Sequence, residues 1–186
     1  MKTRHHTVTL AHLINMAGLI GICASLILAF YYQIAMLELP CPLCLLQRVG
    51  LIIAGFGFLF NILLGIRNSH YGMVIFGSIL TGIIASRQMF LHIIPGDAGY
   101  GSAFLGFHFY TWALITAILI MAAVSVIITI SEVDVVIRPL NINPVFLRIT
   151  GWIFILLISA NLISTLLECG GGQCADNPVT YELLSK

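Results

Sequence analysis

Five long apolar runs, separated by short polar segments, dominate the pattern of this sequence. They cover about residues 11–36, 46–66, 72–94, 106–130 and 146–167. Each run reaches or exceeds the roughly 20 residues that an α-helix needs to cross the apolar core of a bilayer. The pattern therefore predicts an all-α membrane protein, a polytopic bundle of five transmembrane helices. Because the connecting segments are short, residues 1–186 are expected to form a single membrane domain that ends in a tail, residues 168–186.

The composition favours the lipid bilayer as the main surroundings of the chain. Hydrophobic residues make up 60% of the sequence and charged residues 8%, and the mean hydropathy is +1.07. These values do not suit a surface that faces water. A net charge of +1 leaves no basic stripe, so nucleic acid is not an expected partner. The first apolar run is far longer than the roughly 7–15 residues of a cleaved signal peptide, so we expect it to remain as the first span.

The few charges predict how the bundle is oriented. Basic residues gather at one set of span ends, at Lys2, Arg4, Arg67, Arg138 and Arg148. Acidic residues gather at the other ends, at Glu38, Asp97, Glu168, Asp176 and Glu182. Lysine and arginine in short loops stay on the cytoplasmic side. We therefore expect a multi-pass protein of the bacterial inner membrane with a cytoplasmic N-terminus and a periplasmic C-terminus.

Small and amide side chains inside the runs predict contacts between helices. Gly21 with Ser25, and Gly50 with Ala54, are spaced four apart, so each pair forms a small face on which another helix can pack. Interhelical hydrogen bonds are expected from three amides, Asn15, Asn61 and Asn161.

Four of the five cysteines form two close pairs, and the predicted topology puts both pairs on the periplasmic side. The pairs are Cys41 with Cys44 and Cys169 with Cys174, whereas Cys23 stands alone inside the first span. The periplasm is an oxidising compartment in which disulfides persist. Two disulfides are therefore favoured over metal-binding thiolates, and no metal ligands are predicted.

The first pair opens the second span in the sequence Pro40-Cys41-Pro42-Leu43-Cys44-Leu45-Leu46-Gln47-Arg48. A helix N-terminus favours the thiolate form of a cysteine and hence disulfide exchange. Arg48 follows Cys44 by one helical turn, which places a positive charge on the same face at the membrane boundary. That charge could stabilise an anion formed on a quinone. Two readings stay open here: the pair is a passive staple, or Arg48 only reaches toward the headgroups.

With this motif, the chain resembles the disulfide bond formation protein B family, DsbB, over roughly its first 130 residues. The resemblance implies a four-helix catalytic core, here followed by a fifth transmembrane helix. It also implies an enzyme that reoxidises a DsbA-like periplasmic thiol oxidase and passes the electrons to ubiquinone or menaquinone in the membrane. Cys41 and Cys44 would be the quinone-coupled pair, and Gln47 and Arg48 would lie on the quinone side.

Two further polar residues, Arg87 and His92, are predicted to contribute to quinone binding. Arg87 lies late in the third span and matches an arginine of the DsbB pattern, and His92 follows near the outer boundary. A charged residue within a span should face a pocket or a partner, and a histidine could relay protons. The alternatives are that Arg87 bonds to a neighbouring helix and that His92 is an interfacial anchor.

The sequence departs from the DsbB pattern in the position of its second cysteine pair. Family members carry that pair in the loop between the third and fourth spans, but residues 95–105 contain no cysteine here. Instead, Cys169 and Cys174 flank three glycines and a glutamine at the end of the fifth span. We predict that this pair exchanges with the soluble partner. The alternative is a structural clip on the tail.

Together these features predict a quinone-dependent protein-disulfide oxidoreductase that supports disulfide bond formation. Two rival classes remain. One is a quinone-coupled enzyme similar to vitamin K epoxide reductase, although the C-x-x-C of such proteins lies in a later helix. The other is a metal-binding or transport protein that uses the four outward thiolates.

Overall fold

Five long helices form the computed structural model, which describes residues 2–130 and 144–185. The helices are α1 (Lys2–Ala35), α2 (Pro42–Leu64), α3 (Asn68–Leu91), α4 (Phe109–Ile130) and α5 (Pro144–Cys169). Two short antiparallel strands, β1 (Ala103–Phe104) and β2 (Phe107–His108), lie in the loop before α4. All five helices contain a segment long and apolar enough to cross a membrane. The predicted fold class, an all-α polytopic membrane protein, is confirmed. Arg138, on which part of the predicted orientation depends, lies outside the described residues.

Local sequence signals explain where the helices that carry cysteines begin and end. Cys41 is the N-cap of α2 and has an extended backbone, and Pro42 follows at the first helical position. Proline suits this position because its missing N–H has no partner there and its φ is already helical. At the same end of the bundle, α5 stops at Cys169 because Gly170 takes a positive φ of 63°. Glycine adopts this conformation without steric cost.

The closest helix packing joins α2 and α3. A Cβ atom placed on Gly77 would lie 2.5 Å from both the carbonyl oxygen of Gly50 and the backbone nitrogen of Ala54. The predicted contact face of Gly50 and Ala54 is therefore confirmed. The prediction for Gly21 was wrong, since no described atom of another element lies within 4 Å of a Cβ built there. Small residues at this spacing permit close packing but do not choose the partner helix.

Buried amides connect helices along the bundle, as predicted. Asn15 donates to the hydroxyl of Tyr71 at 2.7 Å, and Asn61 donates to Asn15 at 2.8 Å. Asn161 accepts from Arg48 at 3.4 Å. Each contact joins two helices and pairs polar groups that would otherwise be costly to bury.

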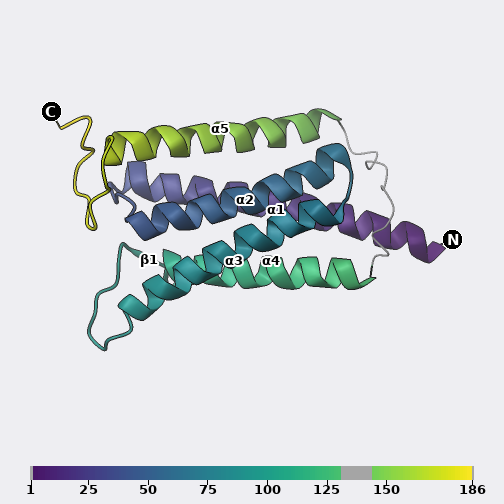
Figure 1. Cartoon of the computed structure of the whole chain (residues 1–186), viewed down its shortest axis with the longest axis horizontal. Helices are drawn as coiled ribbons and strands as arrows, with labels where there is room; N and C mark the ends of the chain where they lie inside the picture. Colours follow the sequence, from purple (N-terminus) through teal and green to yellow (C-terminus); the bar gives the residue numbers. More distant parts are fainter. Residues whose placement is uncertain (1, 131–143, 186) are drawn as a thin grey trace.

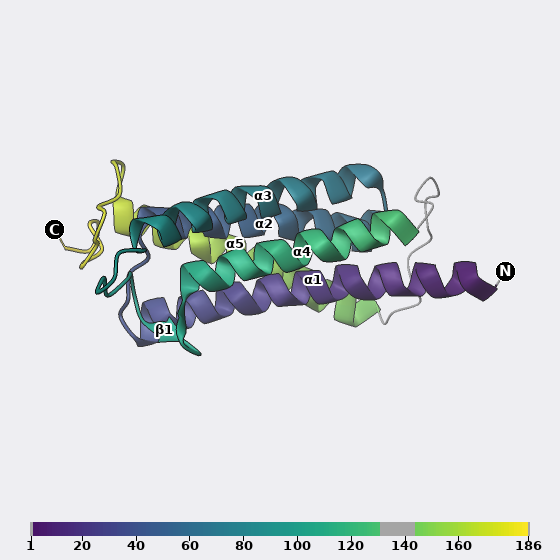
Figure 2. The same ribbon diagram turned by 90° about the horizontal axis from the view of Figure 1, so that it is seen from below.

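Both cysteine pairs lie at the same end of the bundle. Figure 1 shows the start of α2, the loop between α3 and α4, and the tail after α5 at the end opposite to the N-terminus. The perpendicular view in Figure 2 gives the same arrangement, with α1 and α4 side by side. This end, called here the cysteine end, carries the candidate site.

Candidate functional site

Each cysteine pair forms a disulfide. The Cα atoms are 5.0 Å apart in Cys41–Cys44 and 4.4 Å apart in Cys169–Cys174. Cys41 also caps α2, because its sulfur accepts from the backbone N–H of Cys44 at 3.1 Å. A backbone donor at the start of α2 therefore points at the sulfur of Cys41, and it favours the Cys41 thiolate once the disulfide is reduced.

A glutamine of α3 contacts both sulfurs of the first pair. The side-chain nitrogen of Gln88 lies 3.2 Å from Sγ of Cys41 and 3.5 Å from Sγ of Cys44. Gln47 donates to the Gln88 oxygen at 2.7 Å, which fixes the orientation of the Gln88 amide. Gln88 is fully buried, so water does not replace it as a donor to the sulfurs.

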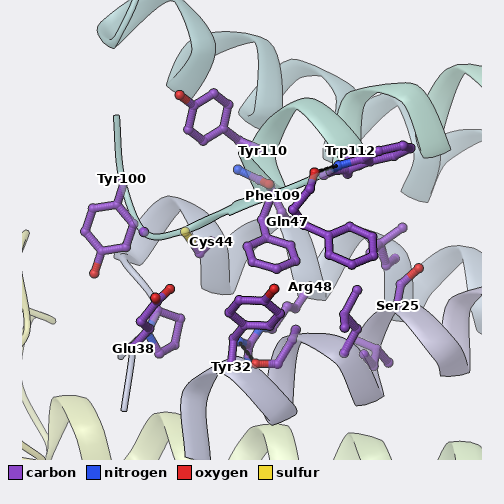
Figure 3. Close-up of a pocket in the computed structure, with 18 of the residues that line it drawn as sticks. Ser25, Tyr32, Glu38, Cys44, Gln47, Arg48, Tyr100, Phe109, Tyr110 and Trp112 are labelled. Atoms are coloured by element: carbon purple, nitrogen blue, oxygen red, sulfur yellow. Dashed lines mark hydrogen bonds between the residues drawn. The ribbon is translucent and has the colours of Figure 1, made fainter. Parts of the chain in front are cut away.

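A pocket of about 220 Å³ opens beside the first pair. Its walls come from α1, α2, α4 and the segments that precede α2 and α4, and they are mostly apolar. Cys44, Gln47 and Arg48 form the α2 wall, whereas Cys41 does not line the pocket. Figure 3 shows the ring of Tyr32 opposite that of Phe109, and their centroids are 4.6 Å apart. Cys44 is thus the sulfur that a molecule in this pocket would meet.

Neutral groups of α1 hold the side chain of Arg48. Its side chain is only 9% exposed, and it donates to the side-chain oxygen of Gln33 at 2.8 Å and to the carbonyl of Ala29 at 3.4 Å. Its guanidinium carbon lies 5.4 Å from the ring centroid of Phe30. These contacts fix the cation at the pocket wall without neutralising it, so its charge can act on a ligand there.

The fifth helix and the tail complete the surroundings of Arg48. Gln33, which accepts from Arg48, donates to Ser164 of α5 at 2.5 Å and to the hydroxyl of Tyr181 in the tail at 3.1 Å. The tail also folds back on α5, where the N–H of Leu183 donates to the carbonyl of Leu167 at 3.1 Å. A continuous hydrogen-bonded path therefore runs from Arg48 to the segment that carries the second disulfide.

The first half of the chain, which carries the first disulfide and Arg48, is similar to known proteins. The family model described as disulfide bond formation protein DsbB matches residues 11–99. This segment contains Cys41, Cys44, Arg48 and Gln88, the residues that the structure gathers around the pocket and the first disulfide. Over residues 11–99, the chain is similar to the DsbB family.

Curated members of the DsbB family match the same half. The disulfide bond formation protein B of Marinobacter nauticus is 40% identical over 81 residues, which are 41% of this chain and 48% of that protein. The protein of the same name from Nitrosomonas eutropha is 38% identical over 79 residues, with shares of 39% and 48%. The match thus spans about half the length of these relatives. No solved structure matches.

The loop between α3 and α4 lies at the rim of the pocket. Tyr100 donates to the carbonyl of Leu39 at 2.7 Å, and Ser102 hydrogen-bonds Glu38 through both its N–H and its hydroxyl. Burial raises the pKa of Tyr100, and the charges of Glu168 and Glu38 raise it further. This loop therefore closes over the segment before α2, although it carries no cysteine.

The structure does not bring Arg87 and His92 to this pocket. Arg87 is exposed on the outer side of α3, in a separate apolar depression between α3 and α4. His92 contacts Asp97 at 3.1 Å and stacks on Tyr110, whose ring lines the pocket. Hydrogen bonds from Gly99 and from His92 lower the pKa of Asp97. The neighbour of Arg87 in sequence, Gln88, points to the site instead, because adjacent helical residues differ in direction by about 100°.

Replacing Gln88 by leucine is expected to slow the reaction of the reduced first pair with an alkylating reagent about tenfold at neutral pH. A hydrogen bond to a charged acceptor contributes about 1.5–3 kcal/mol, and leucine removes the donor that favours the thiolate. The measurement is the alkylation rate of Cys41 and Cys44 in the reduced protein, followed by mass spectrometry. Replacing the adjacent Met89 by leucine is the matched control, and equal rates in both variants would contradict the role of Gln88.

Proposed function

We propose that this chain is a thiol:disulfide oxidoreductase of the bacterial inner membrane that reoxidises a DsbA-like periplasmic dithiol protein and passes the electrons to a membrane quinone. One observation carries the proposal: Cys44 of a redox-capable pair and the cation of Arg48 share one wall of an apolar pocket. The similarity of residues 11–99 to the DsbB family supports it. The proposal places the cysteine end and the tail on the periplasmic side and the N-terminus in the cytoplasm.

The pocket has the chemistry that a quinone head group requires. Its walls are rich in aromatic side chains, among them Tyr32, Phe109 and Trp112, which suit a flat ring. Arg48 and Gln47 supply hydrogen-bond donors for a carbonyl oxygen. When bound, ubiquinone or menaquinone would accept two electrons and two protons. Both share this head group chemistry, and the pocket does not distinguish them.

In this proposal, the tail pair reacts with the partner protein and the α2 pair reacts with the quinone in the pocket. A thiolate of the partner attacks Cys169–Cys174 through a mixed disulfide, and exchange then reduces Cys41–Cys44. Gln88 donates toward both sulfurs of the pair, and Arg48 stabilises negative charge that develops in the pocket beside Cys44. Cys41, buried beside Cys44, closes the disulfide again.

The direct test is turnover by the full chain in detergent. The protein is mixed with a reduced DsbA-like protein and either ubiquinone or menaquinone, and quinol formation is followed by absorbance. The expected result is quinol formed in equal amount to the disulfide in the partner. An absence of quinol with both quinones would overturn the proposed function.

Replacing Arg48 by methionine is expected to lower kcat/KM for the quinone about 10²-fold. Removal of one preorganised donor at a site of developing charge costs about 10²–10³ in rate. The matched control is Arg87→Met, which removes the same charge from the exposed side of α3 and should leave kcat/KM within about twofold, the range of a surface substitution. Equal losses in the two variants would show that the pocket beside Cys44 is not where the quinone reacts.

A further inference from the structure

Glu168 is a buried acid that the proposed function leaves unexplained. Its side chain is 3% exposed at the end of α5, directly before Cys169. Neither carboxylate oxygen has a hydrogen-bond partner among the described residues. Burying an unsatisfied carboxylate is costly, and native structures contain few such groups. A group of this kind next to a redox-capable cysteine is a candidate for proton transfer.

Charged and titratable groups approach Glu168 from three other segments. Arg48 of α2 and Tyr100 of the loop before α4 interact with it electrostatically. In the tail, the N–H of Glu182 donates to the carbonyl of Glu168 at 3.3 Å, and Tyr181 belongs to the hydrogen-bonded cluster of Arg48. Glu168 thus directly precedes Cys169 and interacts electrostatically with Arg48 of α2, the helix that begins at the first disulfide.

We propose that Glu168 accepts and returns the proton that moves during exchange between the Cys169–Cys174 pair and the Cys41–Cys44 pair. This inference rests on the proposed function, in which the tail pair passes electrons to the pair on α2. No described residue donates a hydrogen bond to either carboxylate oxygen of Glu168, so both oxygens are available to a proton.

The exchange balances in protons and electrons. The Cys169 thiol gives its proton to the Glu168 carboxylate, and the resulting thiolate attacks one sulfur of Cys41–Cys44. That disulfide breaks, a bond between the two pairs forms, and the leaving thiolate takes the proton back from Glu168. Cys174 then gives its proton to Glu168 and attacks the Cys169 sulfur of this bond. The Cys169–Cys174 disulfide forms, and the second sulfur of the α2 pair leaves as a thiolate that takes the proton from Glu168. Two electrons reach the α2 pair, which becomes a dithiol, and no proton is lost overall.

A structural role for Glu168 makes a different prediction. If the carboxylate only balanced the charge of Arg48, its neutralisation would alter stability or pocket binding but would leave the pH dependence of exchange unchanged. A proton acceptor instead determines how the exchange rate varies with pH. The pH profile therefore separates the two roles.

The test measures exchange in the full chain without quinone. Oxidised protein is mixed with a reduced DsbA-like protein, which donates electrons through the tail pair, between pH 5.5 and 8.5, quenched with acid at successive times, and alkylated, and mass spectrometry then reports the reduction of each pair. Glu168→Gln is expected to slow the transfer from the tail pair to Cys41–Cys44 about tenfold or more near neutral pH. Its rate should rise with pH across the range, whereas the wild-type rate should level off. Glu182→Gln removes an exposed tail carboxylate and should follow the wild type.

The outcomes distinguish this inference from the proposed function. If the wild type forms quinol and Glu168→Gln shows the wild-type rate and pH profile, only the role of Glu168 is overturned. If the wild type forms no quinol, the proposed function itself fails. Should Glu168→Gln lose the folded state, Glu168→Asp carries the test, because it keeps the acid. Its pH profile should then level off like that of the wild type at a lower rate, and a profile that rises throughout would overturn the inference.

Discussion

Replacing either Cys41 or Cys44 by alanine is expected to lower quinol formation by at least about 10³-fold. A residue that forms a covalent intermediate cannot be bypassed by its neighbours, so its loss removes the whole route. The measurement is quinol formation with a reduced DsbA-like protein. Cys23→Ala is the control, because this thiol is buried in α1 and does not line the pocket. Turnover in the Cys41→Ala variant at the wild-type rate would reject the assignment of the redox centre.

The two variants should differ in one further respect. Cys41→Ala leaves the Cys44 thiol on the pocket wall, whereas Cys44→Ala leaves a buried Cys41 thiol outside the pocket. With the tail cysteines blocked, an apolar maleimide should label Cys41→Ala faster, and added quinone should protect only that variant. Protection of Cys41 alone would show that the roles of the two cysteines are reversed.

The sequence predicted the spans well because their cause is local. An apolar run of about 20 residues has few alternatives to a membrane helix, since backbone groups must be hydrogen-bonded within the segment. The ends were less accurate. The first span was expected to reach residue 36, but α1 ends at Ala35, and Leu37 takes a positive φ of 57°. Such an end depends on the contacts of the following segment, which composition does not encode.

The candidate site was predicted only where residues are close in sequence. Cys41, Cys44, Gln47 and Arg48 lie within about two turns at the start of α2, so their closeness follows from helical geometry. Gln33 of α1 was missed. Its place beside Arg48 depends on how the helices are rotated against one another, and no periodicity in the sequence reports that rotation.

On α3, the sequence also did not indicate which of two neighbouring residues, Arg87 or Gln88, faces the first disulfide. Arg87 was predicted to contribute to the pocket because an arginine within a span is costly unless it faces a pocket or a partner. Near the end of a helix, however, a long side chain can reach the membrane surface at little cost. The shorter, neutral side chain of Gln88 does not reach the membrane surface, so its amide needs hydrogen-bond partners inside the bundle, and it finds them in Gln47 and Cys41. Amides late in a span were therefore the better signal for the site.

The second cysteine pair could be predicted from the sequence, but its surroundings could not. The pair was recognisable from its spacing and its glycines, but its connection to Arg48 through Gln33 and Tyr181 was not. Through Gln33, α5 and the tail are hydrogen-bonded to the residue that holds Arg48 at the pocket wall, although both lie outside the matched family segment. A tail that only clipped the end of α5 would not need it.

Replacing Cys169 or Cys174 by serine is expected to lower oxidation of a DsbA-like protein at least about 10²-fold, while dithiothreitol still drives quinol formation. The partner's thiolate needs an accessible disulfide to attack. Cys174 is partly exposed, whereas Cys41 is buried and Cys44 lines the pocket. A small dithiol can enter the pocket and reduce Cys41–Cys44 directly, so the two electron donors separate the shuttle from the quinone reaction.

A structural clip predicts the opposite pattern for these variants. Loss of a clip would loosen the tail and, through Tyr181 and Gln33, the surroundings of Arg48, so quinol formation would fall alike with both donors. Replacing Tyr181 by phenylalanine is the matched control, because it removes the tail's hydroxyl contact but keeps the disulfide. If Tyr181→Phe reproduces the serine variants with both donors, the pair is a clip. If it leaves oxidation of the partner intact while either serine variant abolishes it, Cys169–Cys174 is the disulfide that the partner attacks.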